Sequence, residues 1–219
     1  YHTDAPSYTK FYVRKILNHL PFSGFFINKL KLPEKVAANQ TTNIISYFKF
    51  CRKVMINDFS YDNLRVEHFQ DKIIKLERGI DKKIFKKKNV NKLNFLRKYN
   101  INCDQKIIFF CGRIHELKGA LFLSEVHKIL KSRKHKVTTI LAGENLQGDE
   151  CKRLGGRNLV LLGHIDEKEI SSFLNICDLF VFPSLYENGP QVVLEAKSCQ
   201  AVCIVSPNVG GRRIRKSGE

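Results

Sequence analysis

The second half of the chain alternates short apolar runs with amphipathic segments. Runs rich in β-branched and aromatic residues predict strands, and apolar residues three or four apart predict helices. Strands are expected at residues 106–111, 137–142, 159–162, 179–182 and 201–205, and helices at 121–130, 170–176 and 192–196. Such alternation is typical of a parallel sheet buried between helices. We therefore expect a doubly wound α/β domain, whose ligands bind beyond the carboxyl ends of the strands.

The first half of the chain is less regular. Basic amphipathic helices are expected at residues 8–20 and 41–53, short strands at 54–56 and 72–76, and a further helix at 62–69. Residues 81–91 read DKKIFKKKNVN, a charged run without periodicity that is typical of a linker. We place a domain boundary there and expect domains at residues 1–90 and 91–219.

The composition indicates a folded chain with excess positive charge. Of the 219 residues, 43% are hydrophobic, which is enough for a sizeable core. Lys and Arg total 38 and Asp and Glu total 21, so the formal net charge is +17. Most of the excess lies in residues 1–104, which hold 21 basic and 9 acidic side chains. Such a surface attracts phosphates, whether in nucleic acid, anionic lipid or nucleotides.

The cysteines and the apolar runs indicate the cellular compartment in which we expect the protein. No apolar run is long enough to span a membrane, and no signal peptide opens the chain. The seven cysteines include no C-x-x-C pair, so we expect free thiols, with Cys111, Cys177 and Cys203 buried. Free thiols indicate a reducing compartment, and we expect a cytoplasmic protein, either free or peripheral at the inner face of a membrane. The only methionine is Met55 and the chain starts at Tyr1, so we expect an internal fragment.

The first candidate site is the loop GRIHELKG at residues 112–119, between a predicted strand and a predicted helix. Gly112 permits a tight turn and a close approach of the backbone to a ligand. Arg113 and Lys118 lie five residues apart, and a guanidinium with an ammonium suits a diphosphate. The alternative is that both are solvated loop cations. The spacing of a Walker loop is absent.

The second candidate site is the loop and helix start at residues 183–195. Pro190 is placed to begin a helix, so the backbone amides of Gly189 and Gln191 point out of a helix N-terminus, which attracts anions. Glu187 and Glu195 are candidates to accept hydrogen bonds from sugar hydroxyls. The alternative is that Glu187 favours the helix dipole and Glu195 is a solvated helix residue.

Together these loops resemble a known family. Glu187 and Glu195 form the E-x7-E signature of the retaining glycosyltransferases of family four, and residues 112–119 match that family's G-R-x4-K-G loop. Further similar motifs are Gly143-Glu144, Leu162-Gly163-His164, the strand CDLFVFPS at 177–184, Gly210-Gly211, RGID at 78–81 with Phe85, and YHTDAPSY at 1–8. The resemblance implies an α/β fold of the GT-B type, with two Rossmann-like domains.

The resemblance also implies roles for individual residues. Arg113 and Lys118 would bind the donor diphosphate, Glu187 and His2 would face the donor sugar, and Glu195 would hold the ribose. The remaining donor-binding positions are Gly112, Gly143, His164, Gly189, Pro190 and Gln191. The implied reaction moves a hexose, with retention, from a UDP- or GDP-linked sugar to a sugar or lipid acceptor. No other cofactor is implied. The chain contains no D-x-D pair, which metal-dependent glycosyltransferases generally use, so we expect no metal.

Three departures from the family pattern stand out. The glycine-rich loop that opens the family's first domain is missing. Gln200 replaces a customary Gly, and RRIRK at residues 212–216 follows the late glycine pair where an acidic residue is common. The chain also stops at Glu219, before the closing helices of the family. The resemblance therefore implies an N-terminally truncated first domain and a second domain without its closing helices.

Three alternatives remain open from the sequence. The RRIRK cluster and the missing lobe fit a non-catalytic remnant, or pseudoenzyme, that acts as a basic nucleotide- or anion-binding module. Residues 82–88 suggest nucleic acid, but the run lacks interleaved stacking aromatics, which argues against it. Residues 8–31 mix aromatic and basic side chains, among them Phe22, Phe25 and Phe26. That mixture suits either an anionic membrane surface or the core helices of a soluble domain.

Overall fold

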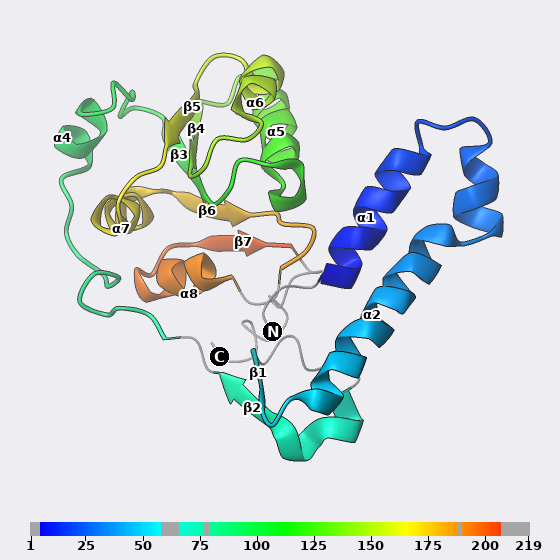
Figure 1. Cartoon of the computed structure of the whole chain (residues 1–219). Coiled ribbons are helices and arrows are strands. Elements are labelled where there is room, and N and C mark those ends of the chain that lie inside the picture. The colour runs from blue at the N-terminus through cyan, green and yellow to red at the C-terminus, as the bar shows by residue number, and fades with distance from the viewer. Residues whose placement is uncertain (1–4, 58–65, 77–78, 188–189, 207–219) are drawn as a thin grey trace. The chain divides into compact units, whose positions relative to one another are not determined.

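The computed structural model describes residues 5–57, 66–76, 79–187 and 190–206. The chain forms two compact units (Figure 1). One comprises residues 1–78 with 186–189, and the other residues 79–185 with 190–219. Within the described residues each unit has its own sheet, of two strands in the first unit and five in the second.

The second unit is built on the predicted parallel sheet. Its strand order is β5-β4-β3-β6-β7, and every neighbouring pair is parallel. The strands are β3 (Lys106–Cys111), β4 (Val137–Ala142), β5 (Leu159–Gly163), β6 (Leu179–Phe182) and β7 (Cys203–Val205). The chain runs outward from β3 to β5, and then crosses to the other side of β3 for β6 and β7. This reversal of strand order creates the crevice in which doubly wound sheets bind ligands.

Five α-helices of the second unit lie within the described residues: α4 (Lys92–Arg97), α5 (Ala120–Ser132), α6 (Gly148–Gly155), α7 (Glu167–Ile176) and α8 (Gln191–Ser198). α5 packs against β4, α6 against β5, α7 against β3 and α8 against β7. The core contains stacked rings, with the centroids of Phe109 and Phe173 5.1 Å apart. α7 begins at Glu167 rather than at the predicted 170, because Asp166 caps it and accepts a hydrogen bond from the Glu169 amide.

The charged run at residues 81–91 contains no helix or strand, yet it is anchored to the second unit. The side chain of Phe85 is only 2% exposed. Ser171 Oγ on α7 donates to the Ile84 carbonyl at 2.7 Å, and Ser198 Oγ on α8 donates to the Phe85 carbonyl at 2.6 Å. The Lys88 amide donates to Asn175 Oδ1 at 2.9 Å. The run is therefore part of the folded surface of this unit, which begins at Gly79.

The first unit contains a helical hairpin and a small parallel sheet. Its elements are α1 (Ala5–Leu17), the π-helix η1 (Phe25–Lys29), α2 (Leu32–Phe50), β1 (Val54–Asn57), the 3₁₀ helix η2 (Val66–Lys72) and β2 (Ile73–Leu76). β1 pairs with β2 in parallel. Phe48 from α2 packs with Val54 and Ile56 from β1 to form a small core.

The helix boundaries of the first unit differ from the predicted ones. α2 begins nine residues before the predicted start at 41, because Pro33 lies in its first turn, where proline is compatible with a helix. α1 spans residues 5–17 rather than 8–20. The helix predicted at 62–69 falls partly outside the described residues. Its described part belongs to η2, in which Phe69 has non-helical backbone angles.

Candidate active site

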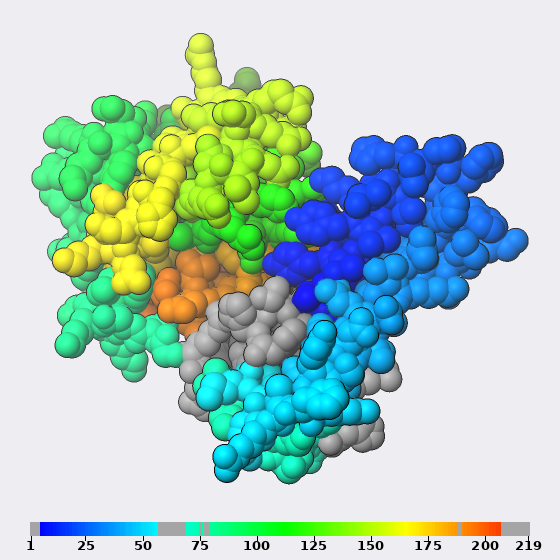
Figure 2. All heavy atoms as spheres, in the orientation of Figure 1, coloured from blue at the N-terminus to red at the C-terminus, as the bar shows by residue number. Residues whose placement is uncertain are grey.

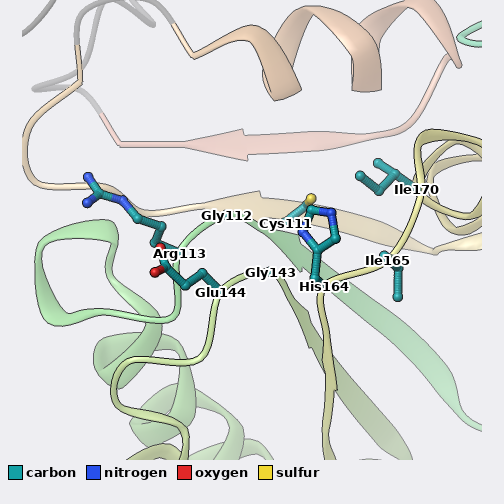
Figure 3. A pocket seen from close by; sticks show the side chains of 8 residues that line it. All are labelled: Cys111, Gly112, Arg113, Gly143, Glu144, His164, Ile165 and Ile170. Atoms are coloured by element: carbon teal, nitrogen blue, oxygen red, sulfur yellow. The ribbon is translucent and has the colours of Figure 1, made fainter.

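A pocket lies at the carboxyl ends of β3, β4 and β5, within the second unit. Its volume is about 270 Å³, at the low end for small-molecule sites and suited to part of a nucleotide. The lining residues are Cys111, Gly112, Arg113, Gly143, Glu144, His164, Ile165 and Ile170 (Figure 3). Of the predicted site residues, the structure thus brings together Gly112, Arg113, Gly143 and His164.

Two glycines form the floor where the β3 and β4 loops meet. Gly112 and Gly143 have φ angles of 153° and 133°, which side-chain-bearing residues rarely adopt. The Gly112 amide donates to the Ala142 carbonyl at 2.9 Å, and the Gly143 amide donates to the Gly163 carbonyl at 2.7 Å. A Cβ atom at Gly143 would lie 2.1 Å from the Gly112 carbonyl oxygen. Three adjacent strand ends are therefore held close together with bare backbone facing the pocket.

The loop that carries Arg113 is bound to the loop after β4. Ile114 is fully buried, its amide donates to the Glu144 carbonyl at 2.8 Å, and its carbonyl accepts from the Gln147 amide at 2.9 Å. Gln147 Oε1 also accepts from the Glu116 amide at 2.6 Å. The Arg113 side chain is exposed, and Figure 3 shows it extending away from His164 at the opposite end of the pocket. A solvent-accessible guanidinium is thus presented on a fixed backbone.

Lys118 ends the short 3₁₀ helix η3 (Glu116–Lys118), and it is partly buried and not among the pocket-lining residues. His115 caps this helix, with Nδ1 accepting from the Leu117 amide at 3.2 Å. The Leu117 carbonyl accepts from the Leu185 amide at 2.9 Å and from Ser184 Oγ at 3.1 Å. These hydrogen bonds join the loop after β3 to the loop after β6.

Glu195 lies in α8, and its carboxylate is partly buried. Burial raises its pKa, and the nearby charge of Glu167 raises it further, against the hydrogen bond with Gln191. At the pocket wall, burial together with the charge of Glu195 raises the pKa of the Cys111 thiol to about 12. Glu195 is not among the residues that line the pocket. Pro190 caps α8 rather than forming its first residue, which corrects the predicted helix start.

His164 and Ile165 follow β5 directly, after Gly163 turns the chain with a φ of 70°. The His164 side chain is exposed, whereas Ile165 is buried. Ile170 from α7 completes this end of the pocket. His164 can offer polar contacts, and Ile165 and Ile170 apolar contacts, to a flat ring of a ligand.

Several predicted positions are placed elsewhere or cannot be described. Glu187 groups with the first unit, and Gln191 is exposed at the start of α8. Other predicted positions lie outside the described residues, namely His2, Arg78, Gly189 and residues 207–219. That last segment includes the glycine pair and RRIRK. Among the described residues, no three His, Cys, Asp or Glu side chains are grouped so as to hold a metal ion.

Some lining residues were not predicted as site residues. Cys111 was expected to be buried, but it is partly exposed because the strand ends at the pocket, and Cys177 and Cys203 are also partly exposed. All seven cysteines are free, as expected. Glu144 could have been identified from its position directly after a strand-end glycine. Ile165 and Ile170 read as ordinary core positions, so no sequence signal marked them.

Comparisons with known proteins agree with this geometry. A family model described as "Glycosyl transferases group 1" matches residues 91–219. A capsular polysaccharide biosynthesis glycosyltransferase, CapM, of Staphylococcus aureus is 30% identical over 86% of this chain and 49% of its own length. An Escherichia coli enzyme named UDP-Gal:alpha-D-GlcNAc-diphosphoundecaprenol alpha-1,3-galactosyltransferase is 27% identical over 81% of this chain and 46% of its own length. The chain thus spans about half the length of these relatives.

Solved structures show the same fold. Anabaena HepE, crystallised with UDP and glucose, aligns with a TM-score of 0.63 at 19% identity, over 80% of this chain and 50% of HepE. The expected α/β architecture of the GT-B type is therefore confirmed. Because the family match covers more than half of the chain, including the whole five-stranded sheet and every loop that lines the pocket, the chain belongs to the glycosyl transferases group 1 family.

Proposed function

We propose that this chain is the nucleotide-sugar-binding part of a retaining glycosyltransferase, which transfers a hexose from a UDP- or GDP-linked donor to a sugar or lipid acceptor without a metal ion. The observation that carries the proposal is the pocket at three strand ends. It combines bare glycine backbone, an exposed guanidinium and, at the other end, an imidazole with two isoleucine side chains. A nucleoside diphosphate has matching parts, namely a flat base, a ribose and an anionic diphosphate.

The donor would lie along the pocket from His164 to Arg113. The base would lie against His164, Ile165 and Ile170, which line one end of the pocket. The ribose hydroxyls would donate hydrogen bonds to Glu195, which lies in α8 and contributes to the raised pKa of Cys111 in the pocket wall. The diphosphate would meet the Gly112 backbone and the Arg113 guanidinium, whose fork binds phosphate oxygens in pairs. HepE, which shares the fold, was crystallised with UDP and glucose.

The chemistry requires stabilisation of the departing diphosphate while an oxocarbenium-like sugar develops positive charge. Arg113 and Lys118 supply positive charge on the loop after β3. The N-terminus of α8 adds a partial positive charge from its free amides. Glu187 and His2 would hold the hydroxyls of the donor sugar. With these groups in place, charge neutralisation of the leaving group does not require a divalent cation.

The acceptor class is proposed from the relatives. The E. coli relative is named for a diphosphoundecaprenol substrate, and the S. aureus relative for capsular polysaccharide biosynthesis. We therefore propose a lipid-linked sugar as the acceptor, met at the inner face of a membrane. No helix among the described residues is long and apolar enough to cross a bilayer.

The test is a calorimetric titration of UDP and GDP into the 219-residue chain, compared with Arg113→Ala. Loss of a charge-assisted hydrogen bond should weaken binding by about tenfold or more. Arg133→Ala, at the exposed end of α5, is the matched control and should bind as the parent does. The proposal would be contradicted if neither UDP nor GDP binds to the chain. It would also be contradicted if Arg113→Ala and Arg133→Ala bind the nucleotides equally well. Transfer by the complete protein that is lost in EDTA and restored by Mn²⁺ would contradict metal independence.

A further inference from the structure

The glutamine that precedes α6 does not cap its own helix. Gln147 occupies the N-cap position of α6, yet its side chain makes no capping hydrogen bond to that helix. A side chain at this position ordinarily accepts from the second or third amide of its helix. Here Asn145 provides the cap, because its Oδ1 accepts from the Gly148 amide at 2.7 Å. Figure 2 shows α6, in yellow-green, at the surface of the second unit. The Gln147 side chain is therefore left for another partner.

That partner is the loop after β3. Gln147 Oε1 accepts from the Glu116 amide at 2.6 Å, and the Gln147 amide donates to the Ile114 carbonyl at 2.9 Å. Glu116 is the first residue of η3, where a backbone amide has no acceptor within the helix. Gln147 thus holds both the chain that leads into η3 and the first amide of η3 itself.

The orientation of the Gln147 amide group is fixed from its other side. Gln147 Nε2 donates to Glu150 Oε2 at 3.4 Å, and Glu150 Oε1 lies 3.8 Å from Arg153 Nη2. A reversed amide group would turn its NH2 toward the Glu116 N–H and its oxygen toward the Glu150 carboxylate, so both contacts would be repulsive. The side chain therefore presents its acceptor to η3 in one orientation.

η3 belongs to the loop that carries both cations of the proposed donor site. Arg113 lies three residues before η3, and Lys118 is its last residue. Hydrogen bonds within the loop, such as that from the Lys118 amide to the His115 carbonyl at 3.0 Å, shape the turn but do not attach it to another element. Gln147 attaches it to the loop after β4. Cations on a loop that is already held lose less conformational entropy when they bind a ligand.

The geometry points to Gln147 as a positioning residue that holds Arg113 and Lys118 where the donor diphosphate would bind. Gln147 is not among the residues that line the pocket, so it acts through the backbone of η3 and not by contact with the donor. The inference rests on the proposed function and extends it to a residue outside the pocket. It implies a selective effect, in which binding of the diphosphate depends on Gln147 and binding of the base and ribose does not.

The experiment compares nucleoside diphosphates with their nucleosides on the 219-residue chain. Calorimetry measures the affinity for UDP and GDP, and NMR titration measures the affinity for uridine and guanosine. Gln147→Met keeps the length of the side chain but removes the acceptor for the Glu116 amide. It should weaken binding of the diphosphate by about fivefold, as expected for one hydrogen bond, and leave nucleoside binding unchanged. Hydrogen exchange of the Glu116 amide should be faster in this variant than in the parent.

Gln105→Met is the matched control. Gln105 is also partly buried, and its Oε1 accepts from Thr138 Oγ1 at 2.7 Å near the amino ends of β3 and β4. The pocket lies at the opposite ends of these strands. Gln105→Met should therefore bind both kinds of ligand as the parent does and leave exchange of the Glu116 amide unchanged, even where its unfolding free energy falls.

Three results would overturn the inference. One is that Gln147→Met binds the diphosphate as tightly as the parent, and another is that exchange of the Glu116 amide is unchanged. The third is an equal loss of nucleoside and diphosphate binding, which would show that Gln147 supports the pocket as a whole. The parent separates these results from failure of the proposed function. A parent that binds neither UDP nor GDP overturns both, whereas a parent that binds while Gln147→Met binds equally overturns only the role of Gln147.

Discussion

The carbonyl oxygen of Gly112 lies so close to the α-carbon of Gly143 that a methyl group on Gly143 would be 2.1 Å from it. These residues directly follow the neighbouring strands β3 and β4 and line the pocket. Their contact allows two strand-end loops to meet without side chains between them. The resulting backbone surface is where a diphosphate would be bound.

Gly143→Ala should therefore destabilise the second unit by about 3 kcal/mol. The added methyl would clash with the Gly112 carbonyl, a backbone group that cannot move as a flexible side chain could. The substitution should also abolish nucleotide binding, which is measurable by calorimetry. Gly156→Ala is the control: its φ is also positive, at 71°, but no atom lies within 4 Å of the added methyl. Its ψ of −143° is also nearly restricted to glycine, so Gly156→Ala should lose about 2 kcal/mol of unfolding free energy but keep its binding. Equal effects of the two substitutions would show that the close contact is unimportant.

Phe85→Ala should lower the unfolding free energy of the second unit by about 3 kcal/mol, because a buried ring leaves a cavity. Urea unfolding measures this, with Phe122→Ala, a 59% exposed position on α5, as the control that changes little. Amide hydrogen exchange at residues 84–88 should be slow in the parent and faster in the variant. If residues 81–91 were a free linker, neither measurement would change.

His127 is fully buried between α5 and β4, where its Nδ1 lies 2.9 Å from Thr139 Oγ1 and its Nε2 3.1 Å from the Arg157 carbonyl. A carbonyl only accepts, so Nε2 carries the proton and Nδ1 accepts from the threonine hydroxyl. Burial lowers the pKa of His127 below its usual 6.5, although the bond to Arg157 opposes this.

The unfolded chain therefore takes up a proton on His127 at a higher pH than the folded chain does. The contribution to stability is present above pH 6.5 and is lost as the pH falls through 6.5 toward the lowered value. Urea midpoints measured at about pH 7.5 and about pH 5.5 should show this decline. In His127→Gln the decline should be smaller, whereas His135→Gln, at an exposed position, should behave as the parent. A decline that is undiminished in His127→Gln would assign it to other groups.

Glu195→Gln should weaken UDP binding by about tenfold, because a neutral amide accepts weaker hydrogen bonds from ribose hydroxyls than a carboxylate does. The pKa of Glu195 is raised, first by burial, so its charge is lost at a higher pH than for an ordinary glutamate. The affinity of the parent for UDP should therefore decline as the pH falls toward that raised pKa. The affinity of Glu195→Gln should not show this pH-dependent decline. Glu125→Gln, on the exposed side of α5, is the control for a general charge effect.

Much of the second unit was predictable from local patterns. The bounds of β3, β4 and β6 match the predicted strands, because a strand buried on both faces is a continuous apolar run. α6 was missed because residues 148–155 read GDECKRLG, a short and mostly polar surface helix with little apolar periodicity. The start of α2 was missed for a similar reason, since residues 32–40 mix polar residues, alanines and a proline.

By itself, the sequence determined the family, the parallel sheet and the loops in which Gly112, Arg113, Gly143 and His164 lie. Tertiary structure decided which of those loops share a pocket, because the strand order places the ends of β3, β4 and β5 side by side. It also decided that Phe85 is buried within a charged run and that Phe22 is exposed within an apolar one. Periodicity reports how a segment could be buried, but burial itself depends on which distant segments fold against it.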